Sequence, residues 1–362
     1  MKGSLQLGKI AGIRVSIHWT FLLLIAYIAF SNYRNGENLT QTGWTLLLVG
    51  SVFFVVFLHE LGHALAAKHY HINTTSITLL PIGGVANLES IPENPKEELV
   101  VAFAGPAVNI VIAAITGLFI TFPDTSQQLV SLLEQGLNAQ TFFIQFLIIN
   151  IWLAVFNLIP AFPMDGGRVL RALLAFRMPR HKATLVAARI GQFLAILFVF
   201  AGFYSNPFLI FIGLFIILGA QSEAEMTKMS YFTKGHLVRD VVMHHYETLQ
   251  ETQTIAEAVE LLLNGTSRQF LVLDKDTPVG TINRDGIIQA LSQSGKETSI
   301  SSIVQRNMPV LDAGTPLEKI YLSLLQRKDE LHLVYDSGVF IGVLDFDNVA
   351  EFVMIKNADG NL

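Results

Sequence analysis

The sequence contains no cysteine and few charged residues. Without cysteine among its 362 residues, the chain has neither disulfide bonds nor thiolate metal ligands, so a metal site must use histidine and carboxylate side chains. Charged residues make up 15% of the chain and hydrophobic residues 51%, which is too apolar for an ordinary soluble protein. The net charge of −5 is mild and argues against a nucleic-acid partner.

The hydrophobic residues are concentrated before about Gln221, in six apolar segments. Each is near the length that crosses a bilayer, although the last is short. The segments are Ser16–Ser31, Gly43–Ala67, Leu99–Phe122, Thr141–Ile159, Ala187–Tyr204 and Pro207–Ala220. Because no cleavage site of small residues marks a signal peptide, we expect the first segment to be retained. The pattern predicts a polytopic α-helical membrane protein with about six transmembrane helices.

Basic residues predict the orientation of these segments. They gather before the first segment, after the second and after the fourth, whereas the opposite loops hold almost none. They are Lys2, Lys9, Arg14, Lys68, Lys96, Arg168, Arg171, Arg177, Arg180 and Lys182. By the positive-inside rule, we expect a multi-pass protein of the cell membrane with both termini in the cytoplasm.

The most informative motif, His59-Glu60-Leu61-Gly62-His63, lies inside the second apolar segment. Ionisable residues in such surroundings are costly and mark functional sites. Residues four apart share one face of a helix, so His59 and His63 can bind one metal ion. Glu60 can reach a water beside the metal but is poorly placed as a third ligand. The spacing is typical of zinc hydrolases; the alternative, a chance match, is rare in an apolar helix.

Asp165 is the only acidic residue in or beside the fourth apolar segment. Pro160 and Pro163 end that helix, and Gly166 and Gly167 are expected to let the backbone bend sharply. Catalytic zinc needs three protein ligands and an open position, so a carboxylate on such a break is a reasonable third ligand. The alternative is an aspartate that caps a helix end.

A short hairpin is predicted between the second and third segments, in the range Asn73–Ile91. Thr75–Leu79 alternates like a strand, and Gly83-Gly84 can form a turn or a bulge. An unpaired edge of this hairpin, on the cytoplasmic side, would accept an extended substrate strand. The alternative is an ordinary connecting loop.

These motifs together resemble the site-2 protease family of intramembrane zinc metalloproteases. That family carries HExxH in one transmembrane helix and N-x-x-P-x-x-P-x-D-G-G in another, which here is Asn157–Gly167. Phe103–Asn109 is similar to its G-P-x-x-N signature, in which we expect Gly105 and Asn109 to serve close helix packing. The resemblance covers about Met1–Gln221.

The resemblance implies a peptidase with one zinc ion on His59, His63 and Asp165 and with Glu60 as general base. It also implies regulated cleavage, within the lipid bilayer, of single-span membrane proteins such as anti-sigma factors or signal-peptide remnants. Asn157 is expected either to hold the substrate backbone or the oxyanion, or to make an interhelical hydrogen bond.

From about Leu237 the sequence changes to a repeated strand–helix–strand–strand–helix pattern. Gly280 and Asp285 recur 62 residues later as Gly342 and Asp347. The repeats resemble CBS domains. The chain also has no inserted PDZ-like domain between its second and third segments, and in both respects it resembles the branch of the family with C-terminal CBS domains. We therefore expect a transmembrane zinc metalloprotease domain at 1–221, a linker at 222–236, and a soluble α/β tandem CBS module with domains at 237–295 and 296–356.

The CBS resemblance suggests a nucleotide site. In nucleotide-binding relatives the aspartate holds ribose hydroxyls, which makes Asp285 and Asp347 candidate ligands of an adenine nucleotide. Asn283 and Asp345 replace the threonine or serine that lies near phosphate in those relatives, and Asp345 would repel phosphate. The alternative to nucleotide binding is a module that serves only dimerisation. Because CBS modules usually associate in pairs, we also expect a homodimer.

Two other functions are alternatives to proteolysis. A transporter gated by CBS domains would need inverted repeats and a charged permeation path, which the sequence lacks. A catalytically inactive scaffold would have no need of an intact Glu60 between two histidines. The sequence therefore favours an intramembrane zinc endopeptidase that is regulated by cytoplasmic CBS domains.

Overall fold

The fold is described from a computed structural model that covers residues 3–359, apart from 82, 89–91, 122–124 and 135. The chain divides into two units, Met1–Glu225 and Met226–Leu362. The ends of two expected segments, Glu89–Ile91 and Phe122, lie outside the described residues.

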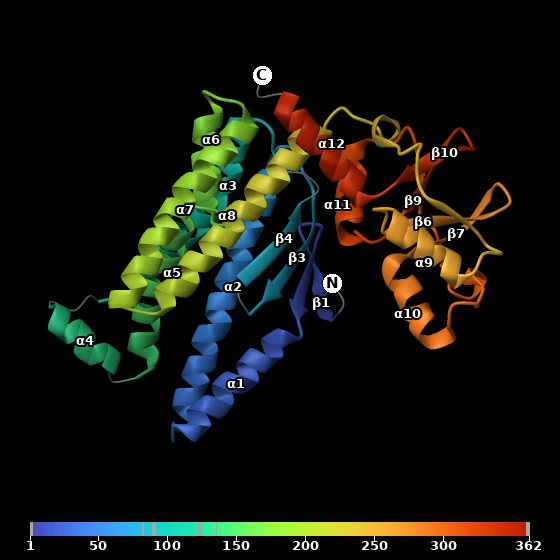
Figure 1. The fold of residues 1–362 in the computed structure, drawn as a ribbon. Helices are drawn as coiled ribbons and strands as arrows, with labels where there is room; N and C mark the ends of the chain where they lie inside the picture. Colours follow the sequence, from blue (N-terminus) through green and yellow to red (C-terminus); the bar gives the residue numbers. More distant parts are fainter. Residues whose placement is uncertain (1–2, 82, 89–91, 122–124, 135, 360–362) are drawn as a thin grey trace. The chain divides into compact units, whose positions relative to one another are not determined.

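The first unit is a helical bundle with a small sheet (Figure 1). Its helices are α1 (Thr20–Arg34), α2 (Leu39–His69), α3 (Pro95–Gly117), α4 (Ser126–Glu134), α5 (Ala139–Asn157), α6 (Asp165–Ala175), α7 (Arg180–Tyr204) and α8 (Phe208–Thr233). In the described part of the chain, five of these helices are long and apolar enough to cross a membrane: α2, α3, α5, α7 and α8. The expected linker at 222–236 is mostly helical, because α8 continues to Thr233.

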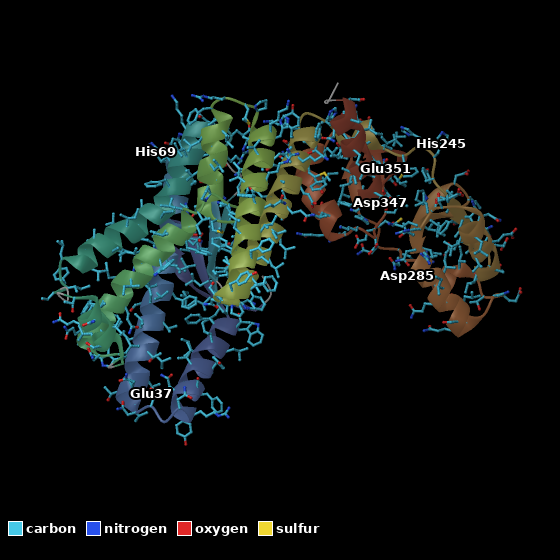
Figure 2. All side chains as sticks on the ribbon, turned by 60° about the vertical axis from the view of Figure 1, so that its left-hand side comes forward. Glu37, His69, His245, Asp285, Asp347 and Glu351 are labelled. Carbon is cyan, nitrogen blue, oxygen red and sulfur yellow. The ribbon has the colours of Figure 1, made fainter. Side chains whose placement is uncertain are left out.

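The first apolar segment forms a shorter helix than expected. α1 has 15 residues and is about 22 Å long, which is less than the roughly 30 Å of a hydrocarbon core. Ser16–His18, at the start of the expected segment, belong to a strand instead. By contrast, α2 has 31 residues and runs the length of the unit, so that Glu37 before it and His69 at its end lie at opposite ends (Figure 2).

Helices α2 and α3 pack closely because small residues face one another. A Cβ atom on Gly62 of α2 would lie 2.8 Å from the Val108 side chain and 3.0 Å from the Ala104 carbonyl oxygen on α3. Such small-residue contacts let helix backbones approach in membranes. The HExxH motif on α2 is thereby held directly against the G-P-x-x-N motif on α3.

A four-stranded sheet packs against α2, in the order β1-β2-β3-β4. The strands are β1 (Ser4–Ile10), β2 (Ile13–His18), β3 (Thr74–Leu80) and β4 (Gly83–Leu88). The β3–β4 hairpin agrees with the predicted one, and β4 lies at the edge of the sheet. Strand β2 pairs in parallel with β3, a contact between distant parts of the chain that the sequence did not predict.

Helix α6 was also not predicted, because its 11 residues are too few to span a membrane and its arginines were assigned to a cytoplasmic loop. Arg171, which we expected in a cytoplasmic loop, lies in this helix and is fully buried. Its Nε donates to Glu98 Oε1 of α3 at 2.7 Å, and its Nη1 lies 2.5 Å from Glu223 Oε1 of α8. Arg171 therefore joins three helices instead of lying free in a loop.

The second unit contains two three-stranded sheets, β5-β6-β7 and β10-β9-β8, each with flanking helices. In each sheet one strand pair is parallel and the other is an antiparallel hairpin, as expected for a repeated α/β unit. The elements are η1 (Val238–Val241), β5 (Thr248–Gln250), α9 (Ile255–Asn264), β6 (Gln269–Asp274), β7 (Thr277–Asn283), α10 (Arg284–Ser294), η2 (Ile300–Ser302), β8 (Val310–Asp312), α11 (Leu317–Gln326), β9 (His332–Asp336), β10 (Val339–Leu344) and α12 (Phe346–Asp359).

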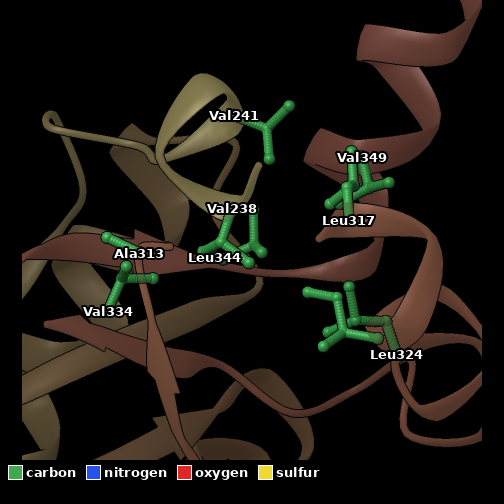
Figure 3. Close-up of a cluster of buried hydrophobic side chains, with 9 residues drawn as sticks. Val238, Val241, Ala313, Leu317, Leu324, Val334, Leu344 and Val349 are labelled. Carbon is green, nitrogen blue, oxygen red and sulfur yellow. The ribbon is translucent and has the colours of Figure 1, made fainter. Parts of the chain in front are cut away.

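The hydrophobic cores of this unit cross the repeat boundary that the sequence suggested. Val238 and Val241 of η1 pack among buried residues of the second repeat, including Leu317 and Leu344 (Figure 3). Conversely, Ile300 of η2 packs in the core of the first repeat. The ranges 237–295 and 296–356 therefore follow the repeat in sequence but do not coincide with the two cores.

Candidate metal centre

Three side chains from α2 and α6 meet inside the first unit. The Nε2 atoms of His59 and His63 lie 3.2 Å apart, and each lies 3.1 Å from Oδ2 of Asp165. All three residues are buried, and they form the one potential metal-binding group among the described histidines and carboxylates. Tetrahedral zinc with bonds of about 2.0–2.1 Å separates its ligand atoms by about 3.3 Å. The observed spacing therefore fits one zinc ion and leaves a fourth position open.

The other nitrogen of each histidine has its own acceptor. Nδ1 of His59 lies 2.6 Å from Oδ1 of Asn109, and Nδ1 of His63 lies 2.7 Å from the carbonyl oxygen of Val101. These acceptors on α3 keep the proton on Nδ1 and leave the Nε2 lone pairs for a metal. Asn109 therefore has a role beyond the helix packing that the sequence predicted, since it orients a predicted ligand.

Gly105 provides the space for both imidazoles. A Cβ atom at this position of α3 would lie 2.2 Å from Nε2 of His63 and 2.7 Å from Nε2 of His59. No side chain fits there without moving the histidines. The four-residue spacing between Gly105 and Asn109, which puts both on one face of α3, was the available signal for this role in the sequence.

Asp165 is the first residue of α6 and does not cap it, because the N-cap position is taken by Met164. The sharp bend expected at Gly166 and Gly167 is absent, since both residues are helical. These glycines instead let α6 approach the backbone of the segment that precedes it. A Cβ on Gly166, for example, would lie 2.2 Å from the Ile159 carbonyl oxygen. The segment between α5 and α6 thus packs on the first turn of α6 and holds Asp165 opposite the histidines.

Glu60 lies next to His59 on α2 and is half-buried. It faces the edge strand of the sheet, where a Cβ on Gly84 of β4 would lie 2.5 Å from Glu60 Cγ. Its carboxylate makes no hydrogen bond or ion pair with any residue in the described part of the chain. The carboxylate is therefore available to water or to a ligand.

A cavity of about 700 Å³ brings the predicted site residues together. The two histidines, Glu60 and Asp165 line it, together with Asn157, Arg168 and the β4 residues 83–86. Asn157 is the last residue of α5, and its Nδ2 donates to the Leu153 carbonyl oxygen at 2.9 Å. That bond lies within α5, so the interhelical bond considered for Asn157 is not observed.

A second cavity, of about 680 Å³, lies in the second unit. It is lined by Asp285 and Asp347, which Figure 2 labels, and by Asn283 and Asp345. The last two have equivalent capping roles: Oδ1 of Asn283 accepts from the Gly286 amide at 2.8 Å, and Oδ1 of Asp345 accepts from the Asn348 amide at 2.9 Å. Burial raises the pKa of Asp345 above its ordinary value.

Comparisons with known proteins agree with this geometry. Residues 47–198, which contain all the predicted metal-site residues, match peptidase family M50, and residues 238–293 match the CBS domain. A zinc metalloprotease of Methanocaldococcus jannaschii is 30% identical over 98% of this chain and 97% of that protein. A putative zinc metalloprotease of Synechocystis is 28% identical over 95% of this chain and 94% of that protein.

Among solved structures, the site-2 protease of Methanocaldococcus jannaschii is 36% identical over 61% of this chain and 95% of that chain, with a TM-score of 0.42. The sequence similarity spans both units of the chain, and the family match coincides with the His-His-Asp cluster. The chain therefore belongs to the site-2 protease family, peptidase family M50, and is a multi-pass membrane zinc metalloprotease with a C-terminal CBS module.

Proposed function

We propose that this chain cleaves the membrane-spanning segments of single-span proteins, such as anti-sigma factors or signal-peptide remnants. One observation carries the proposal: the cluster of His59, His63 and Asp165 is buried, and both histidines lie in α2, which is long and apolar enough to cross a membrane. His59 precedes Lys68, near the end of α2, by nine residues, which is about 14 Å along the helix. A hydrocarbon core is about 30 Å thick, so a peptide bond cut at this depth lies within the bilayer.

His59, His63 and Asp165 would hold the zinc ion, and their spacing fits it. When bound, zinc polarises the scissile carbonyl and lowers the pKa of a water in its open position. Glu60 accepts the proton of the attacking water and delivers it to the leaving amine. The free carboxylate of Glu60 beside the cluster supports this role.

Asn157 holds the substrate backbone or the developing oxyanion in this proposal. One of its amide N–H groups is used by the Leu153 carbonyl oxygen, which fixes the side chain and leaves the second N–H for a ligand in the cavity. Donors fixed in this way stabilise charge that develops on a carbonyl oxygen.

The edge strand β4 receives the substrate as an added strand. Its residues 83–86 line the cavity beside Glu60, and no strand of the described chain pairs with its outer edge. An extended peptide that pairs with this edge presents its backbone to the metal centre. A transmembrane helix must unwind to bind in this way, so helix-weakening residues near the cleavage site should speed cleavage.

Both termini lie in the cytoplasm in this proposal, because the basic residues gather on that side. The CBS module regulates the peptidase from there, pairs with a second copy to form a homodimer, and binds an adenine nucleotide through Asp285 and Asp347. Arg268, Arg284 and Lys328 line the same cavity and would offset the repulsion between phosphate and Asp345.

Co-expression with candidate single-span proteins tests this function. The wild type is compared with Glu60→Gln, which keeps the three metal-binding side chains. We expect precursor to accumulate only with the variant and fragments cut inside the membrane-spanning segment only with the wild type. Equal precursor levels across a panel of anti-sigma factors and signal-peptide remnants would contradict the proposed substrate class.

A further inference from the structure

Arg168 is a cation in the metal-site cavity. It lies on α6, one turn after Asp165, and is half-buried. Among the described residues that line the cavity, it is the single lysine or arginine. Its charge interacts with Glu60 and Asp165 of the site and also with Glu223 of α8, so it lies within electrostatic range of the reacting groups.

The Arg168 guanidinium has no hydrogen-bond partner among the described residues. It makes no hydrogen bond or ion pair there, and its Nε is completely buried without an acceptor. Arg171, three residues later on the same helix, is paired with Glu98 and Glu223. The two arginines therefore differ in kind: Arg171 joins helices, whereas the five N–H donors of Arg168 have no acceptor in the part of the chain that the structure describes.

A guanidinium with a buried Nε and no hydrogen-bond acceptor is costly within an apolar helical bundle, so its presence points to a ligand. Arginine cannot itself bind a metal cation, because it has no acceptor. The segment to be cleaved is apolar, and its hydrogen-bond acceptors are therefore its main-chain carbonyl oxygens. Unwinding of a transmembrane helix frees those oxygens from their intrahelical partners, and in the bilayer each must find a new donor.

We propose that Arg168 is a substrate-binding residue whose guanidinium donates to main-chain carbonyl oxygens of the unwound segment in the cavity. The inference rests on the proposed function and adds a residue to it. Arg168 lies in the cavity that β4 also lines, so a strand seated on β4 has its backbone within the space that Arg168 faces. Because every peptide offers carbonyl oxygens, this contact favours an unwound backbone and not a particular side chain.

The test uses the full-length chain in lipid nanodiscs and a synthetic single-span peptide of about 25 apolar residues as the probe, with a glycine–proline pair in its cytoplasmic half. Arg168→Met, Arg168→Lys and Glu60→Gln are compared with Arg177→Met. Arg177 is exposed in the turn after α6 and does not line the cavity, so its variant controls for loss of one positive charge. The measurements are kcat, KM, zinc per chain and melting temperature.

We expect Arg168→Met to lower kcat/KM by about tenfold to a hundredfold, because hydrogen bonds from a charged donor are lost. Arg168→Lys should recover only part of this loss, since lysine lacks the planar fork. Zinc per chain and melting temperature should match the wild type, and Arg177→Met should remain within about twofold of it.

Three results would overturn the inference. The first is a kcat/KM of Arg168→Met equal to that of Arg177→Met. The second is loss of zinc from Arg168→Met, which would mean that Arg168 supports the metal site. The third is full recovery of kcat/KM by Arg168→Lys, which would mean that only the positive charge of Arg168 matters. Failure of the proposed function has a different signature. In that case, wild type and Glu60→Gln turn over the probe equally, and the inference falls with the function.

Discussion

Nδ1 of His59 lies 2.6 Å from Oδ1 of Asn109, and this contact joins the metal-site helix α2 to its neighbour α3. The bond fixes both the proton position and the ring orientation of His59. Asn109 is itself fully buried, and its Nδ2 donates to Oδ1 of Asn150 on α5 at 3.4 Å. The histidine geometry therefore depends on three helices and not on α2 alone.

Asn109→Leu should weaken zinc binding. The substitution removes the acceptor for His59 Nδ1, and loss of such a partner costs about tenfold to a hundredfold in metal affinity. Chelator competition on the purified chain measures the effect. Asn150→Leu removes only the longer outer contact and should cost less. Equal zinc affinity in wild type and Asn109→Leu would show that the bond does not orient the ligand.

Gly105→Ala should abolish the metal site with little change in the rest of α3. The new Cβ would stand 2.2 Å from Nε2 of His63, so the imidazole must move away. We expect zinc affinity to fall by about a hundredfold or more. Gly117→Ala is the matched control on the same helix, because nothing lies within 4 Å of a Cβ there. Similar zinc content in the two variants would contradict the close packing described.

Arg171→Met should destabilise the first unit. It removes the shared partner of the buried Glu98 carboxylate and the half-buried Glu223 carboxylate and leaves only the longer contact of Glu98 with Arg180, at 3.6 Å. Breaking a buried ion pair costs about 3–5 kcal/mol. Thermal unfolding in detergent measures the loss. The exposed Arg177→Met should unfold like the wild type. A melting temperature for Arg171→Met that equals the control would mean that the cluster is not a structural ion pair.

Asp345→Asn should stabilise the CBS module at neutral pH. Burial raises the pKa of Asp345 above 3.8, so the folded state binds this proton more tightly than the unfolded state. Ionised Asp345 therefore lowers stability as pH rises through its raised pKa. Asparagine keeps an acceptor for the Asn348 amide and carries no charge.

The gain from Asp345→Asn should be present at pH 7 and should shrink as the pH falls to the ordinary aspartate value of 3.8 and below. Denaturant unfolding of the module in the full-length chain, followed at several pH values, measures this trend. Asp276→Asn, in the exposed β6–β7 turn, is the control. A gain that does not change with pH would exclude the ionisation of Asp345 as its cause.

The parts of the site that the sequence predicted are those that depend on local geometry. His59 and His63 share one helix face whatever surrounds them, and the prolines between α5 and α6 mark the break before Asp165. Cysteine is absent, which restricted the ligands to histidine and carboxylate. The repeat spacing of 62 residues likewise predicted the tandem α/β module.

The parts that were missed depend on contacts between distant segments. The parallel pairing of β2 with β3, and the exchange of η1 and η2 between the two repeat cores, leave no periodic pattern in the sequence. Arg171 was assigned to a loop because its partners, Glu98 and Glu223, are far away in the chain. Asn109 was assigned to helix packing because the sequence does not show which side chain it faces.

The central claim is that two imidazoles and Asp165 hold a zinc ion beside Glu60, which acts as the base. The most direct measurement is zinc per chain together with cleavage of a single-span substrate, for wild type, Glu60→Gln and Asp165→Ala. The account predicts one zinc ion and cleavage in the wild type, retained zinc without cleavage in Glu60→Gln, and loss of both in Asp165→Ala. Wild-type cleavage by Glu60→Gln, or wild-type zinc affinity in Asp165→Ala, would contradict it.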